Sequence, residues 1–145
     1  MKLTVKLRQL LAEIGQESFI LVEENCMTQF FKGIELFNQE QFYDCHDVIE
    51  EVWLVEASDK RPFLQGIIQA AAAFHHYQHG KCGAARSLFS LAVQKLEAYP
   101  EVYCGVRVKV FIGKLENWKK ALDESIALKN RAPLSIPYPK VEISH

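Results

Sequence analysis

Apolar residues recur three or four positions apart through most of the chain, which is the spacing of one face of an amphipathic helix. Four segments show this pattern: 26–37, 41–55, 62–79 and 83–98. Asn38 and Gly80 suit the left-handed conformation that often ends a helix. Pro62 suits the first turn of the third helix, and Asp59 is placed to cap it. The pattern therefore predicts four helices joined by short loops.

Two patterns compete after residue 100. Val106, Val108 and Val110 alternate as in a strand. A helical repeat continues further along the chain, through Val108, Phe111, Ile112, Leu115 and Leu122. Because the helical register lasts longer, we predict a fifth helix over residues 107–128.

The two ends of the chain differ from this middle region. Residues 1–20 are only weakly amphipathic, and Gly15 interrupts them. The tail holds three of the five prolines and is expected to be extended. We therefore expect an N-terminal extension over 1–24, a helical domain over 25–128 and an extended tail over 129–145. The fold class is all-α, a single bundle of five to six helices, and the sequence shows no internal repeat.

Composition narrows the classes of function. With 17 Lys and Arg against 18 Asp and Glu, the net charge of −1 offers no basic excess for nucleic acid. No apolar run approaches the roughly 20 residues of a membrane span, and the first residues lack the apolar core of a signal peptide. The four cysteines form no Cys-x-x-Cys pair and are expected to be free thiols. We expect a cytoplasmic protein without nucleic acid or membrane partners.

The helix predicted over 41–55 has one polar edge. Its most acidic side, with Asp44, Asp47 and Glu51, lies opposite the apolar face and is expected to be solvated. Four side chains fall on the border between the two sides, on successive turns: Tyr43, His46, Glu50 and Trp53. A carboxylate beside an imidazole can fix its tautomer. This edge is a candidate for ligand binding or acid–base chemistry, and equally for a structural hydrogen bond between imidazole and carboxylate.

The helix predicted over 62–79 is apolar almost all round, so it is expected at the centre of the bundle. Gln65, Gln69 and His76 form a polar stripe along it, and burying these groups without partners would cost several kcal/mol. We therefore expect the stripe to meet the polar edge of the preceding helix in a shared cleft. His75 and His79 point elsewhere and are expected near the helix end or the surface.

At these residues the chain resembles the DUF309 family of small helical proteins of unknown function. The resemblance rests on five pieces in order: Phe31-x-Gly33-Ile34-x-Leu36-Phe37-Asn38, Phe42-Tyr43-x-x-His46-x-x-x-Glu50-x-x-Trp53, Phe63-Leu64-Gln65-Gly66-Ile67-Ile68-Gln69-x-Ala71, His76, and Gly80-x-x-Gly83-Ala84. The family usually has Glu in place of Asp47, Gly in place of Gln39 and Asn in place of Lys81. The resemblance implies a helical fold and marks these positions as motif residues, but it implies no reaction.

Three functions fit these residues. The first is a binding module whose cleft holds a small ligand or a side chain of a protein partner. The second is a metal-dependent or acid–base hydrolase, in which His46, Glu50 and His76 hold a divalent metal or Glu50 orients His46 as a base. The third is a structural polar layer in a protein that forms a homodimer or a higher homo-oligomer. No cofactor is predicted beyond such a metal, because the zinc-protease pattern and a phosphate-binding glycine loop are both missing from the sequence.

Overall fold

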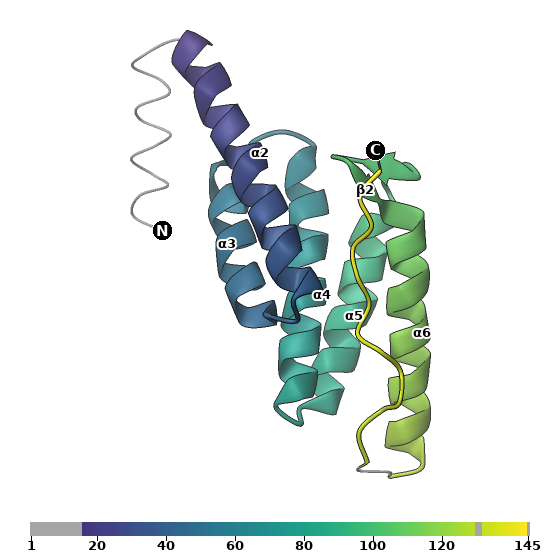
Figure 1. The fold of residues 1–145 in the computed structure, drawn as a ribbon. Helices are drawn as coiled ribbons and strands as arrows, with labels where there is room; N and C mark the ends of the chain where they lie inside the picture. The colour runs from purple at the N-terminus through teal and green to yellow at the C-terminus, as the bar shows by residue number, and fades with distance from the viewer. Residues whose placement is uncertain (1–15, 130–131, 145) are drawn as a thin grey trace.

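The computed structural model describes residues 16–129 and 132–144, with side chains from residue 25 onward. Its helices follow one another as antiparallel neighbours (Figure 1). Their bounds are α2 (Gln16–Asn38), α3 (Phe42–Val55), α4 (Lys60–Gln78), α5 (Cys82–Leu96) and α6 (Val108–Ala127). The all-α bundle predicted from the sequence is confirmed. None of the helices described in these ranges is long and apolar enough to cross a membrane.

The helix α2 begins ten residues earlier than the predicted segment 26–37. It starts directly after Gly15, the residue expected to interrupt the chain, and no proline lies between Gly15 and Asn38. The helix α2 runs through residues 24 and 25, where the predicted extension over 1–24 meets the predicted helical domain. The amphipathic pattern predicted before Gly15 lies outside the described residues.

A short β-hairpin precedes α6, where the sequence pattern left strand and helix in competition. Its strands are β1 (Val102–Tyr103) and β2 (Val106–Arg107), paired antiparallel. Cys104 and Gly105 both have positive φ, 50° and 76°, as a tight hairpin turn requires. The alternation of Val106, Val108 and Val110 does not mark one strand, because Val106 lies in β2 whereas Val108 and Val110 lie in α6. Two-residue strands are too short to produce a period. The helix that follows matches the predicted range within one residue at each end.

The loops α2–α3 and α4–α5 have the same backbone geometry, forty residues apart. Glu40 and Gly80 both adopt left-handed φ, 64° and 76°. Gln41 N–H donates to the Leu36 carbonyl at 2.9 Å, and Lys81 N–H donates to the His76 carbonyl at 2.9 Å. These bonds, six residues to one, are those of the Schellman motif. The expectation that Asn38 takes the left-handed position is wrong, because that position falls two residues later.

The pattern of buried residues also repeats after forty residues. Residues 30, 33, 34, 45, 49 and 52 are buried, and so are residues 70, 73, 74, 85, 89 and 92. The hairpins α2–α3 and α4–α5 are therefore two copies of one structural unit with different side chains, a repeat that the sequence does not show. The backbone equivalence is detectable only in the structure because almost no residue is identical at matched positions.

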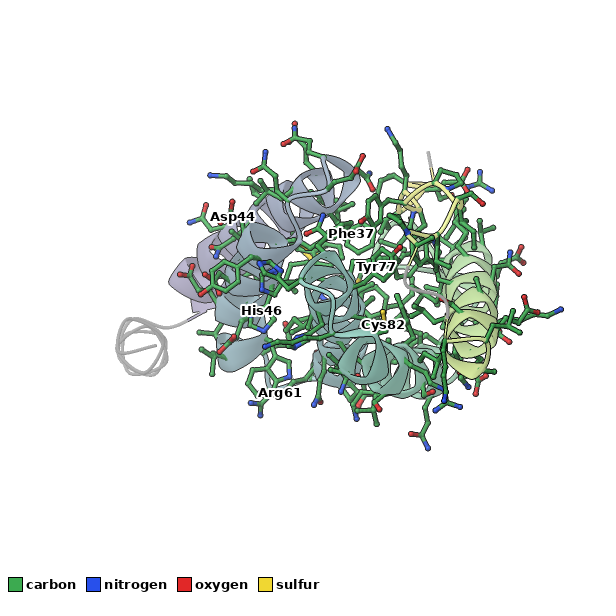
Figure 2. All side chains as sticks on the ribbon, turned by 90° about the horizontal axis from the view of Figure 1, so that it is seen from below. Phe37, Asp44, His46, Arg61, Tyr77 and Cys82 are labelled. Carbon is green, nitrogen blue, oxygen red and sulfur yellow. The ribbon has the colours of Figure 1, made fainter. Side chains whose placement is uncertain are left out.

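The described part of the tail runs back alongside α6 as an extended segment, as predicted (Figure 1). Tyr138 stacks on Trp118 of α6 with ring centroids 5.3 Å apart. The Asn38 side chain donates to the Val141 carbonyl at 3.1 Å and accepts from the Val141 N–H at 2.7 Å. Asn38 thus fastens the tail to the end of α2. Figure 2 shows the interior that the tail helps to cover, with Phe37 and Tyr77 labelled.

The start of α4 differs from the prediction in two respects: the helix begins at Lys60, two residues before the predicted segment 62–79, and its cap is different. Asp59 occupies the N-cap position, but its side chain makes no capping hydrogen bond. Ser58 Oγ instead accepts a hydrogen bond from the Lys60 N–H at 3.2 Å. Pro62 lies in the first turn of the helix, as predicted, where its missing N–H leaves no bond unmade.

Candidate functional site

The polar edge of α3 faces the neighbouring helix α4. At one end of this contact, the Tyr43 ring lies 5.3 Å from the His75 ring, centroid to centroid. At the other end, the Arg61 guanidinium lies 4.1 Å above the centre of the Trp53 ring. We call the strip between these two contacts the α3–α4 seam. We define it by Tyr43, His46, Glu50 and Trp53 on α3 and by Arg61, Gln65, Gln69 and His75 on α4, and the contacts across it join Tyr43 to His75 and Trp53 to Arg61.

Antiparallel packing fixes which residues meet along the seam. The end contacts pair residue 43 with residue 75 and residue 53 with residue 61. Residue numbers therefore increase along α3 in the direction in which they decrease along α4. His46 and Glu50 on α3 therefore lie opposite the turns of α4 that carry Gln65 and Gln69. All four are half-buried, as is Trp53, whereas Tyr43 is 57% exposed and flanks the seam at the surface.

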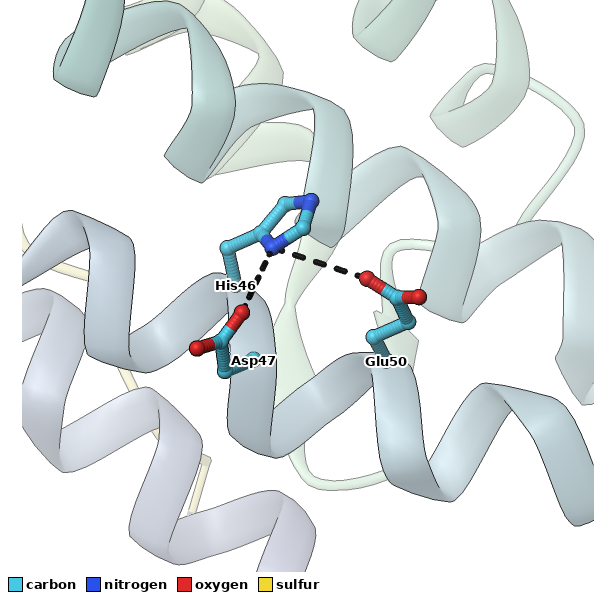
Figure 3. A group of neighbouring side chains, drawn as sticks. All are labelled: His46, Asp47 and Glu50. Carbon is cyan, nitrogen blue, oxygen red and sulfur yellow. Dashed lines mark hydrogen bonds and ion pairs between the residues drawn. The ribbon is translucent and has the colours of Figure 1, made fainter. Parts of the chain in front are cut away.

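Two carboxylates of α3, those of Asp47 and Glu50, turn toward one nitrogen of the His46 imidazole (Figure 3). His46 Nδ1 lies 3.3 Å from an Asp47 carboxylate oxygen and 3.6 Å from a Glu50 carboxylate oxygen. The side chains of His46 and Glu50 are about a third exposed, 31% and 33%, and that of Asp47 is 55% exposed. Asp47 is solvated, as predicted, and yet it reaches the imidazole, which the sequence analysis did not anticipate.

Three polar atoms of the seam are buried and have no hydrogen-bond partner among the described residues. They are Nε1 of Trp53, Nε of Arg61 and Oε1 of Gln69. An unpaired donor or acceptor buried in this way costs about 1–3 kcal/mol. In folded proteins such groups are usually paired by other protein groups or by ordered water, so a partner from outside the chain could fill this role.

Two further histidines, His76 and His79, neighbour His75 beyond the outer end of the seam. The His75 ring lies 5.9 Å from the His76 ring and 4.3 Å from the His79 ring. Burial lowers the pKa of His75, and nearby histidines, including His46, lower it further. His75, expected to point elsewhere, therefore belongs to the seam through its contact with Tyr43.

His76 was expected to join His46 and Glu50 in a metal site. Among the described residues, the ligand atoms that lie within 4.8 Å of one another belong to His46, Asp47 and Glu50, and His76 is not one of them. Arg61 was also missed, because a wheel of one helix does not show which residues of the neighbouring helix will face it.

The cysteines stand apart from this chemistry. None of the four, Cys26, Cys45, Cys82 and Cys104, forms a disulfide, as predicted. Burial raises the pKa of the Cys45 thiol to about 12, so this thiol is neutral near pH 7 and a poor nucleophile. Burial also raises the pKa of Cys104.

Comparison with known proteins agrees with the resemblance drawn from the sequence motifs. Residues 30–88 match the model of the DUF309 family, described as a domain of unknown function. The chain is also similar to the uncharacterized protein YpuF of Bacillus subtilis (strain 168), with 27% identity over 66 residues. That match covers 45% of this chain and 38% of YpuF. The DUF309 segment includes all of α3 and α4, hence the whole seam.

Proposed function

We propose that this protein is a binding module and that the α3–α4 seam holds a small polar ligand. The proposal is carried by the buried Trp53 Nε1–H and Gln69 Oε1, which have no partner among the described residues. A ligand with one acceptor and one donor would complete both hydrogen bonds. The gain on binding would then include the removal of two unpaired buried groups.

The other groups along the seam supply selectivity. His46 and Glu50 are accessible from solvent and offer a donor or acceptor and a negative charge. Tyr43 and Trp53 offer flat aromatic faces at the two ends of the strip, and Arg61 already stacks on Trp53. This combination of aromatic walls and a few polar groups is typical of small-molecule sites.

A hydrolase is a weaker candidate function. A His–Glu pair suits a general base, and His46 lies 3.6 Å from Glu50. The described part of the chain, however, places no serine or cysteine nucleophile in the seam, and the buried Cys45 thiol faces the core. The unpaired donor and acceptor therefore favour binding over catalysis.

A thermal-shift screen tests the proposal. Wild-type protein is heated with a panel of amino acids, dicarboxylates, nucleosides and sugar phosphates, alongside His46→Ala and Gln69→Met. A ligand of the seam should raise the melting temperature of the wild type and should lose most of that effect in both variants. His79→Ala, an exposed histidine at the end of α4, is the control and should respond like the wild type. A shift that is equal in all four proteins would place the ligand elsewhere and contradict the proposal.

A further inference from the structure

We infer that His46, Asp47 and Glu50 form a binding site for one divalent first-row transition-metal ion at the mouth of the α3–α4 seam. This inference deepens the proposed function, because the ion would lie beside the seam ligand. It rests on the positions of three ligand atoms, on the charge they concentrate and on the chemistry of the donor set.

The spacing of the ligand atoms fits a single ion. Two donors about 2.1 Å from a tetrahedral metal lie roughly 3.4 Å from each other. His46 Nδ1 is 3.3 Å from the Asp47 oxygen and 3.6 Å from the Glu50 oxygen, so two of the three separations already have this value. The two carboxylate oxygens lie within 4.8 Å of each other, and a small side-chain rotation would close that gap. Figure 3 shows both carboxylates turned toward Nδ1.

The local charge favours a cation. Asp47 and Glu50 bring two carboxylates to one imidazole, and among the described residues no Lys or Arg lies within 4.0 Å of either carboxylate. A divalent ion would neutralise both negative charges and would relieve their mutual repulsion. Arg61, in the first turn of α4, stacks on Trp53 and forms no ion pair with either carboxylate.

The donor set selects the kind of ion. One imidazole nitrogen with two carboxylate oxygens suits Zn²⁺, Mn²⁺ or Co²⁺, whereas Cu⁺ prefers sulfur ligands and Ca²⁺ prefers an all-oxygen shell. Three protein ligands also leave coordination positions open. Those positions could accept a carboxylate or carbonyl oxygen of a molecule held in the seam, which links the ion to the proposed function.

Calorimetric titration of the full chain with ZnCl₂, after treatment with a chelator and dialysis, tests the site. We expect one Zn²⁺ per chain, and His46→Ala, Asp47→Asn and Glu50→Gln should each weaken binding by about tenfold or more. Because these side chains are about a third exposed or more, the variants should keep the wild-type circular dichroism spectrum. With Co²⁺ as the probe, visible absorption should report the coordinated ion and should change when the nitrogen ligand is removed in His46→Ala.

Two control variants separate this site from its neighbours. Asp44→Asn removes an exposed carboxylate from the same helix, and His79→Ala removes one ring of the His75–His79 pair. Both should bind Zn²⁺ within about twofold of the wild type. The inference is overturned by the absence of saturable binding below about 1 mM, or by a loss that follows His79→Ala rather than His46→Ala. Asp47 lies outside the seam and Gln69 lies within it. If Asp47→Asn leaves Zn²⁺ binding unchanged, the metal site fails. If Gln69→Met leaves the thermal shift caused by the small molecule unchanged, the proposed binding function fails.

Discussion

The α3–α4 seam and the interface between α5 and α6 use matching positions of the two helical hairpins. Forty residues after His46, Glu50 and Trp53 come Arg86, Ser90 and Val93.

On α5 the charged side chain at this register has a partner across the interface, because the Arg86 guanidinium forms an ion pair with Asp123 of α6. In the α3–α4 seam, by contrast, one buried polar atom of α3 (Trp53 Nε1) and two of α4 (Arg61 Nε and Gln69 Oε1) have no hydrogen-bond partner among the described residues.

This difference supports the proposal that the two interfaces have different roles. Among the described residues, no buried side-chain nitrogen or oxygen of α5 or α6 lacks a hydrogen-bond partner, so packing and charge pairing can explain the α5–α6 interface. The α3–α4 seam keeps Trp53 Nε1 and Gln69 Oε1 unpaired on the same kind of backbone. Two copies of a repeated unit can share a backbone and still differ in whether their buried polar groups have hydrogen-bond partners. Such a difference is expected when one copy has been adapted to bind a molecule outside the chain.

The closest approach between helices also differs between the hairpins, and it provides the largest expected effect. A Cβ atom added at Gly33 would lie 2.4 Å from Cγ1 of Ile49, whereas the matching position of the second hairpin already carries Ala73. Gly33→Ala should therefore lower the free energy of unfolding by about 2 kcal/mol, since the buried Ile49 must move. Urea denaturation measures this change.

The matched control is Gly113→Ala in the interior of α6. Nothing lies within 4 Å of a Cβ built at Gly113. The substitution should raise the free energy of unfolding by about 0.5–1 kcal/mol through helix propensity alone. If Gly33→Ala proves neutral like this control, the tight α2–α3 contact is not part of what distinguishes the first hairpin.

The two Schellman turns offer a smaller and more symmetrical comparison. Glu40 adopts a left-handed conformation that disfavours any side chain, whereas Gly80 adopts it without cost. Glu40→Gly should raise the free energy of unfolding by about 1 kcal/mol, and Gly80→Ala should lower it by a similar amount. A Cβ at Gly80 meets nothing within 4 Å, so the backbone conformation alone is tested. Equal signs for the two substitutions, measured by thermal and urea unfolding, would mean that the turns are not equivalent.

The helices of this fold could be predicted from the sequence where periodicity is strong. The range of α3 was predicted within one residue, because apolar residues alternate with polar ones at helical spacing up to a clear loop. The start of α2 was missed because residues 16–25 carry no strong core pattern, and the β-hairpin was missed because two residues per strand have no measurable period. The repeated hairpin was missed because it preserves backbone and burial rather than residue identity.

The candidate site could be predicted only in part for a different reason. The helical periodicity of α3 predicted that His46, Glu50 and Trp53 lie along one edge, because positions three or four residues apart share a face of a helix. The 3.6 Å distance between His46 Nδ1 and a Glu50 carboxylate oxygen agrees with this prediction. The periodicity could not show that Asp47 turns toward His46, because a side chain one residue along reaches its neighbour by rotation about its own bonds. Nor could it show Arg61 above Trp53, because that contact depends on how two helices pack.

The sign of one stability change tests the central claim that the seam is a binding site and not a packing layer. Gln69→Met replaces the amide with an apolar group of similar length. As its reference in the α5–α6 interface, Arg86→Met removes a charged group that has a partner, and this should lower stability by no more than about 1 kcal/mol because the pair is exposed.

The measurement is the free energy of unfolding of Gln69→Met in the absence of any ligand, obtained by urea denaturation. If Gln69 Oε1 is unpaired until a ligand binds, the substitution should raise the free energy of unfolding by about 0.5–1 kcal/mol. A decrease of about 1 kcal/mol or more would show instead that the amide is satisfied within the folded protein, and it would contradict the assignment of the seam as a binding site.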